Sequence, residues 1–264
     1  MFLIRRARLK GQFSFDFQGD AERMIRGVRR FISSNEALGF LSSLISQLIA
    51  RKRKFEFYAQ SKEDEIISRY CPEQYGSYVD IGSGRPISGS NSYFFYKKGW
   101  NGLLIDPIKR NEILSKLIRP RDEFKKLLVG QSGFVTFFET YPYEYSTTSQ
   151  QNFEFLLNLG LVKLKKSTTL KTSPLSSLDL QISELEPSFL SIDAEGADFE
   201  VLRSNNWESF KPRVICIESP KDIDVDSKSI VQYLEKYGYS LIEQSQLSKI
   251  FVSKRYLESA KVGN

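Results

Sequence analysis

The sequence predicts an α/β fold: a mostly parallel, twisted sheet with helices on both faces and an antiparallel hairpin at its C-terminal end. Two observations support this prediction. Short apolar runs alternate with helical patterns from about residue 55 onward, as in strand–helix–strand units. Several of these runs end in an acid, and the first opens into the glycine turn Gly82-Ser83-Gly84. Because the carboxyl ends of parallel strands share one edge of a sheet, we expect the ligand site at that edge.

The expected elements follow in chain order. A helix with a capped start at residues 61–65 precedes the first strand, residues 77–81. After the glycine turn we expect a helix through residues 93–98, ended by Gly99, and a second strand at 103–105. The remaining expected elements are a helix at 110–118, strands near 126–129 and 134–138, a loop over the site at 139–152, a buried strand at 189–192, a helix at 198–204, a buried strand at 214–217, a helix at 228–237, and a hairpin from 239–244 and 249–254.

Residues 1–54 differ from the rest of the chain and are predicted to form a basic, amphipathic helical extension. The main domain is predicted at 55–258, with a tail at 259–264. Apolar residues recur at helical spacing over 37–50, and the basic run 51–54 closes this pattern favourably for a helix C-terminus. One interpretation is a helix lying on an anionic membrane surface or against another protein. The alternative is a helix packed on the core or on a dimer mate, and the oligomeric state stays open.

The composition excludes several classes of protein. With 264 residues and 41% hydrophobic residues, the chain can bury a real core and does not resemble a disordered protein. The formal charge of +6 would suit nucleic acid or anionic lipid, but much of the excess lies near the N-terminus, so no nucleic-acid partner is expected. The two isolated cysteines give neither a disulfide framework nor a metal spacing, which makes a reducing cytoplasm the expected location.

Histidine is absent from the chain. This excludes Ser-His-Asp triads, histidine metal sites and an imidazole general base. Any general base must therefore be a carboxylate, lysine, tyrosine or cysteine.

Four strand ends carry acids, Asp80, Asp106, Asp193 and Glu218. The glycine turn between the first two is not the dinucleotide pattern G-x-G-x-x-G, because Ile87 replaces the third glycine, so NAD is disfavoured. S-adenosylmethionine (SAM) has no phosphate, and a G-x-G turn suffices for its methionine end. An acid at the tip of the second strand can accept hydrogen bonds from its ribose hydroxyls.

These motifs resemble the FkbM-type family of SAM-dependent methyltransferases, and the resemblance extends over roughly residues 55–255. Its most specific part is Asp193-Ala194-Glu195-Gly196, a D-x-E-G motif with alanine where the family commonly has valine. The other matching segments are 58–64, 79–82, 90–93, 98–102, 105–107, 190–202, 206–207 and 212–218, together with the hydroxyl-rich run 146–148.

The resemblance implies a Rossmann-like class I methyltransferase fold, SAM as cofactor, and usually O-methylation of a hydroxyl. Many relatives act on sugars of surface polysaccharides or on glycosylated metabolites, so a sugar or glycoconjugate acceptor is expected. The residues expected around SAM are Asp80, Gly82, Ser83, Gly84 and Asp106, with Gly130 and Gln131 after the third strand bordering the adenine. The residues expected around the acceptor are Tyr93, Tyr143, Tyr145, Ser146 and Thr147.

Three carboxylates are candidates for the base that removes the acceptor proton. Asp193 is the first because the end of the fourth strand lies beside the methyl group in this fold, and Glu195 and Glu218 follow. Asp193 and Glu195 could instead bind a divalent cation, although no metal is expected.

Three other functions compete with this hypothesis. A short-chain dehydrogenase would use Y-x-x-x-K, but here that pattern starts at Tyr93, too early in the chain. A nucleic-acid methyltransferase tends to carry (D/N)PP(Y/F) where this chain has the D-x-E-G motif. A non-catalytic module that only binds SAM is the third alternative.

Overall fold

The structure is a computed structural model that describes residues 36–53, 55–219 and 227–262. The predicted extension is therefore described from residue 36 to residue 53, and its remainder lies outside the described residues.

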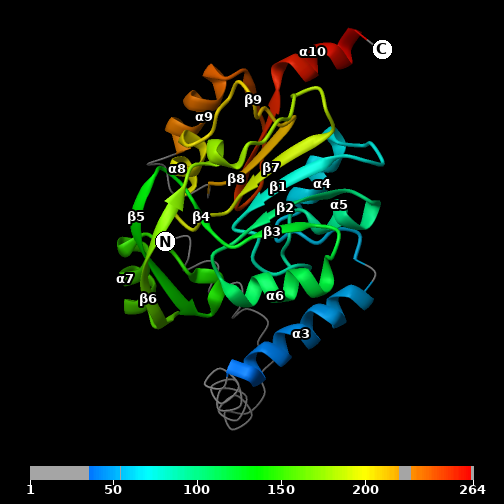
Figure 1. Cartoon of the computed structure of the whole chain (residues 1–264). Helices are drawn as coiled ribbons and strands as arrows, with labels where there is room; N and C mark the ends of the chain where they lie inside the picture. Colours follow the sequence, from blue (N-terminus) through cyan, green and yellow to red (C-terminus); the bar gives the residue numbers. More distant parts are fainter. Residues whose placement is uncertain (1–35, 54, 220–226, 263–264) are drawn as a thin grey trace.

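The centre of the molecule is a seven-stranded sheet of order β3-β2-β1-β7-β8-β10-β9. Strands β3, β2, β1, β7 and β8 are parallel, whereas β10 runs antiparallel to both β8 and β9 (Figure 1). The strands are β1 (Ser77–Ile81), β2 (Asn101–Ile105), β3 (Glu123–Lys125), β7 (Ser188–Ile192), β8 (Val214–Glu218), β9 (Tyr239–Gln244) and β10 (Ser248–Ser253). This mostly parallel sheet with its antiparallel hairpin confirms the predicted Rossmann-like class I methyltransferase fold.

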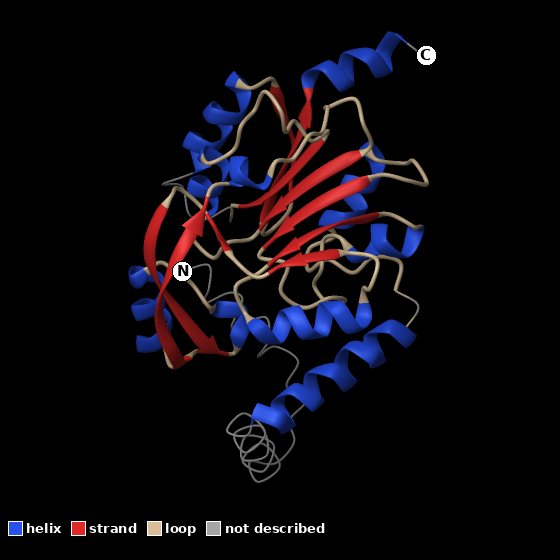
Figure 2. Ribbon diagram, viewed as in Figure 1, coloured by secondary structure: helices blue, strands red, loops and turns tan. Residues whose placement is uncertain are grey.

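Helices cover both faces of this sheet and give it two separate cores (Figure 2). Alternate residues of one strand serve opposite faces: Tyr78 packs in one core with Phe95 and Trp100, and Val79 packs in the other with Val201 and Leu202. The helices are α3 (Glu36–Lys52), α4 (Glu63–Tyr70), α5 (Tyr93–Lys98), α6 (Lys109–Ile118), α7 (Gln150–Asn158), α8 (Asp198–Arg203), α9 (Ser227–Lys236) and α10 (Lys254–Val262), with the 3-10 turns η1 (Tyr143–Tyr145) and η2 (Leu175–Leu178).

A second, three-stranded sheet of order β4-β6-β5 stands beside the first. It consists of β4 (Leu128–Val129), β5 (Gly133–Tyr141) and β6 (Lys163–Ser173). The strands expected near 126–129 and 134–138 are present as β4 and β5, but they lie in this second sheet and not in the parallel sheet, whose edge strand is β3. The expected loop at 139–152 contains the end of β5, η1 and the start of α7. Strand β6 was not predicted because seven of its eleven residues are exposed and four are lysines, so it has no apolar run.

The described part of the N-terminal extension is a helix, as predicted, and it packs on the main domain. Its buried residues are Gln47 and Ala50. The Gln47 side chain accepts hydrogen bonds from the backbone N–H groups of Ile87 (3.0 Å) and Ser88 (3.1 Å), just beyond the glycine turn. At the other end of the chain, α10 runs across the boundary expected at residue 258.

The start of α4 is stabilised differently from the predicted cap. Lys62 is the residue before the helix, in a left-handed conformation, and makes no side-chain cap. Instead, the buried Asp64 carboxylate accepts hydrogen bonds from the backbone N–H groups of Tyr58 (2.6 Å) and Ala59 (3.2 Å). The carboxylate thereby fixes the segment that leads into the helix.

Candidate active site

A cavity of about 360 Å³ lies at the carboxyl edge of the parallel strands, where the sequence placed the site. Its walls come from the ends of β1, β2 and β7, from the second sheet with η1, and from α3, which contributes Ser43. The predicted site residues that line it are Gly82, Ser83, Gly84, Asp106, Gly130, Gln131, Tyr143, Ser146, Thr147, Asp193 and Glu195. Asp80, Tyr93, Tyr145 and Glu218 are not among the lining residues.

The glycine turn brings two strand ends into direct contact. Gly82 has a φ of +72°, and a Cβ built on it would lie 1.8 Å from the carbonyl oxygen of Asp193. Only glycine fits here, because any side chain would collide with the backbone that follows β7. The backbone N–H of Asp193 donates to the carbonyl of Ile81 (3.0 Å). The glycine therefore fixes the position of Asp193 relative to the floor of the cavity.

Asp106, at the end of β2, is tied to the glycine turn. Its carboxylate accepts hydrogen bonds from the N–H groups of Ile108 (2.8 Å) and Gly84 (3.1 Å) and from the side-chain amide of Asn111 (3.0 Å). A carboxylate has about four acceptor positions, so these three bonds leave room for a ligand hydroxyl. Burial raises the pKa of Asp106 to about 6, although the three hydrogen bonds favour the ionised form.

Asp80 lies beneath the turn and does not face the cavity. It is 4% exposed, and its carboxylate accepts a short hydrogen bond from the Ser92 hydroxyl. Burial raises its pKa to about 6, with the nearby Arg119 guanidinium acting in the opposite direction. Asp80 does not line the cavity, and its bond to Ser92 supports the start of α5.

Arg119 is a supporting residue that sequence reasoning missed. It is 1% exposed and donates to the Asp122 carboxylate (2.6 Å), the Ser92 hydroxyl (3.0 Å) and the carbonyl of Pro86 (3.3 Å) in the loop after the glycine turn. Its burial is balanced by the carboxylates of Asp122 and Asp80. A lone arginine at a helix end carries no sequence signal of this kind, because its partners Pro86 and Ser92 are 33 and 27 residues away in the sequence.

The second sheet forms the wall near Gly130 and Gln131. The hydroxyl of Thr172 on β6 donates a short hydrogen bond to the carbonyl of Gln131, and the backbone N–H of Gly130 donates to Ser173 (3.1 Å). Leu127 and Leu128 add apolar surface beside them. This wall combines apolar side chains with hydrogen-bonded backbone groups.

The D-x-E-G motif forms a tight turn held by Asp198 at the start of α8. The Asp198 carboxylate accepts hydrogen bonds from the N–H groups of Ala194 (2.8 Å) and Gly196 (3.1 Å). Glu195 between them has a φ of +49°, an uncommon conformation for a non-glycine residue. Burial raises the pKa of Asp198 to about 7, and the charge of Asp193 acts in the same direction.

Three carboxylates meet at this turn. One ligand oxygen from each of Asp193, Glu195 and Glu218 lies within 4.8 Å of the others, and all three side chains are half-buried. Glu218 thus joins the cluster from β8 without lining the cavity. Such a group can accept a proton or coordinate a divalent cation.

One end of the cavity is closed by the segment between β5 and α7. The Thr147 hydroxyl donates to the carbonyl of Glu195 (2.7 Å), which ties this segment to the D-x-E-G turn. Charged residues surround Tyr143: the Arg110 guanidinium lies 4.5 Å from its ring centroid, and Arg85 pairs with Glu144 (3.4 Å). The cavity therefore has a polar rim with two arginines that the sequence did not single out.

Two of the predicted acceptor residues lie elsewhere. Tyr93 is 3% exposed and packs edge-on against Tyr58 (4.8 Å between centroids), in the core beneath α5. Tyr145 is 6% exposed and belongs to a small core with Phe153. Their rings are used for packing, which a tyrosine-rich sequence cannot distinguish from a sugar-binding surface.

Two buried side-chain oxygens at the cavity indicate whether a polar cofactor would fit it. The Ser83 hydroxyl and the Asp193 Oδ1 atom are buried and have no hydrogen-bond partner among the described residues. Both residues line the cavity, at its glycine turn and at the D-x-E-G turn. Unsatisfied buried oxygens are costly, so a ligand with polar groups at these two points fits the site.

The sequence matches the family described as Methyltransferase FkbM domain over residues 80–241, which is more than half of the chain. The chain belongs to this family. The match spans the glycine turn, Asp106, the second sheet and the D-x-E-G turn, all of which line the cavity.

Solved structures of other methyltransferases are similar to this FkbM protein at low identity. The precorrin-6y C5,15-methyltransferase of Geobacter metallireducens is 11% identical, with 75% of this chain and 92% of that chain covered and a TM-score of 0.41. The TehB-like SAM-dependent methyltransferase of Corynebacterium glutamicum is 14% identical, with 81% and 96% covered and a TM-score of 0.39. Cofactor-bound Rv0187 from MTB is 10% identical, with 86% and 96% covered and a TM-score of 0.34. No curated protein matches the chain.

Proposed function

We propose that this FkbM protein transfers a methyl group from SAM to a hydroxyl of a sugar or of a glycosylated or lipid-linked acceptor. One observation carries the proposal: a single cavity joins the glycine turn and Asp106 to the carboxylates Asp193 and Glu195. The hydroxyls and the tyrosine at its opposite end, on Ser146, Thr147 and Tyr143, suit an acceptor with many hydroxyls.

SAM supplies the methyl group on a sulfonium that leaves as a neutral thioether. The chain's own residues then have three tasks. Asp106 binds the ribose, and the glycine turn lets the backbone approach the methionine end. Asp193 is the proposed base, because it lines the cavity beside the glycine turn and a hydroxyl is a poor nucleophile while it keeps its proton. The hydrogen bond from Thr147 to the carbonyl of Glu195 holds the segment that would contact the acceptor at a fixed position relative to Asp193.

The test is turnover of purified protein with SAM and a panel of sugar and glycolipid acceptors, followed as S-adenosylhomocysteine release and as methylated product by mass spectrometry. We expect Asp193→Asn to lower kcat by about 100-fold or more while SAM affinity stays within a few-fold of wild type. Glu154→Gln, on the exposed face of α7, is the matched control. Turnover that survives in EDTA would assign the carboxylates to proton transfer and not to a metal.

Two outcomes would point to the alternative functions. Tight SAM binding with no S-adenosylhomocysteine from any acceptor would indicate a non-catalytic SAM-binding module. Methylation of nucleic acid, with affinity that falls steeply as salt rises, would indicate a nucleic-acid methyltransferase.

A further inference from the structure

Helix α3 presents an apolar stripe to solvent. Its members are five large aliphatic side chains that are 37–50% exposed: Leu38, Leu41, Ile45, Leu48 and Ile49. At 3.6 residues per turn, their spacing places them within about 100° of the helix circumference. We call this set the α3 stripe. Contiguous exposed apolar surface of this kind marks a contact site, whereas single exposed leucines do not.

The opposite side of α3 faces the protein and is partly polar. Gln47 is fully buried there and binds the backbone at Ile87 and Ser88, and Ser43 lines the cavity. The carbonyl of Gly39 accepts a hydrogen bond from Arg110 on the cavity rim (2.9 Å). The amphipathic pattern of this helix is therefore inverted relative to a helix that only covers a core, because its most apolar side points outward.

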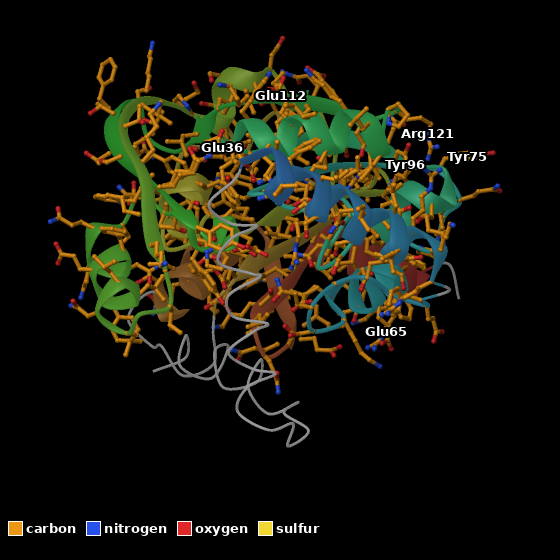
Figure 3. The ribbon with its side chains drawn as sticks, turned by 90° about the horizontal axis from the view of Figure 1, so that it is seen from below. Glu36, Glu65, Tyr75, Tyr96, Glu112 and Arg121 are labelled. Carbon is orange, nitrogen blue, oxygen red and sulfur yellow. The ribbon has the colours of Figure 1, made fainter. Side chains whose placement is uncertain are left out.

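Basic residues stand at the C-terminal end of the stripe. Arg51, Lys52 and Arg53 are all exposed, and Phe55 beyond them is 44% exposed with the Arg53 guanidinium 6.0 Å from its ring centroid. Figures 1 and 3 show α3 as the outermost described helix on the lower side of the molecule. Nothing among the described residues would prevent a flat surface from approaching it.

We propose that the α3 stripe docks on an anionic membrane surface. The apolar side chains would enter the headgroup–acyl boundary, and the three basic residues would lie among anionic headgroups, which is the usual pattern of an interfacial helix. A second copy of the chain packed in parallel on the stripe would bring like charges together at residues 51–53. Among the described residues, no helix has the length and apolar composition of a membrane span.

Docking in this orientation would place the cavity near the membrane. Ser43 lines the cavity from the inner side of α3, so about one helix diameter, roughly 10 Å, would separate the cavity wall from the headgroups. The proposal is independent of which acceptor is methylated, because membrane binding is measured without turnover.

The experiment is co-sedimentation of the full chain with phosphatidylcholine vesicles, with and without phosphatidylserine, at low and high salt. We expect binding to the phosphatidylserine vesicles that weakens as salt rises. The double variant Leu41→Gln, Ile45→Gln should reduce this binding about tenfold or more, because two half-exposed aliphatic side chains no longer enter the membrane. The matched control Leu157→Gln, Leu164→Gln changes side chains that are 42% and 47% exposed on α7 and β6 and should bind as wild type does.

Thermal unfolding and SAM titration of each variant establish that it is folded and that its site is intact. Three results would overturn the proposal. Wild-type protein could stay in the supernatant with both kinds of vesicle. The stripe variant could bind as tightly as wild type. Light scattering could show that the wild-type protein is a dimer and that the stripe variant is a monomer, in which case a second copy of the chain binds the α3 stripe.

Discussion

Replacing Asp106 by asparagine tests the assignment of the cofactor site most directly. The substitution removes one charge but keeps the shape of the side chain and one acceptor oxygen. Oδ2 accepts hydrogen bonds from both Gly84 and Asn111, whereas Oδ1 accepts one from the N–H of Ile108. The remaining oxygen of asparagine is therefore expected at the place of Oδ2, and its NH2 group at the place of Oδ1. A hydrogen bond between a hydroxyl and an ionised carboxylate contributes about 1.5–3 kcal/mol, so SAM affinity should fall about 10- to 150-fold.

The pH dependence of SAM affinity in the wild-type protein gives a second quantitative test of the role of Asp106. The pKa of Asp106 is raised to about 6, so the carboxylate proposed to bind the ribose is largely ionised at pH 8 and about one-tenth ionised at pH 5. Affinity should therefore fall about tenfold between these two pH values in wild type and change less in Asp106→Asn.

Calorimetric titration with SAM measures both effects, with Glu123→Gln on the exposed edge strand as the control for loss of an acid. Unchanged affinity in Asp106→Asn, in a protein that unfolds at the wild-type temperature, would refute the ribose assignment. A loss of affinity with no pH dependence in wild type would refute the role of the charge and leave only that of shape.

Three further predictions concern stability. Arg119→Met should lower the free energy of unfolding, measured in urea, by about 3–5 kcal/mol, because it leaves buried carboxylates without their cation. Arg121→Met, at the surface, should have a much smaller effect. Equal effects of the two substitutions would contradict this role of Arg119. Folding raises the pKa of Asp198 from an ordinary value of 3.8 to about 7, so the folded state binds an extra proton. Stability should therefore increase as pH falls from about 7 to about 4. In Asp198→Asn the melting temperature should vary less with pH over that range, and an unchanged slope would exclude Asp198 as its source. Gly82→Ala should abolish SAM binding and destabilise the fold, because its Cβ would overlap the carbonyl of Asp193. Gly84→Ala meets only the carbonyl of Gly82 at 3.7 Å and should cost about 1–2 kcal/mol for its positive φ. The reverse order of damage would contradict the roles assigned to the two glycines.

Much of the fold follows from local sequence patterns. The parallel strands β1, β2, β7 and β8 are short apolar runs that end in an acid, a pattern in which each run predicts its own element. The glycine turn and Asp106 were found in the same way, since a turn with positive φ and a strand-end acid are both encoded by neighbouring residues. The amphipathic helix over 37–50 was recognised from its period alone.

The tertiary structure decided which of these residues act together. Strand β6 forms a wall of the cavity because it pairs with β5 over nine residue pairs, although its exposed lysines give no strand signal. Tyr93 and Thr147 looked equally suitable for an acceptor, but helix α5 turns Tyr93 into the core while a bond to Glu195 holds Thr147 at the cavity. Sequence determines a residue's chemistry and its local conformation, and only the folded chain determines its distance from residues far away in the sequence. The folded chain alone brings Asp193 next to Glu218 of the neighbouring strand and buries Arg119 beside Tyr78, Pro86 and Ser92.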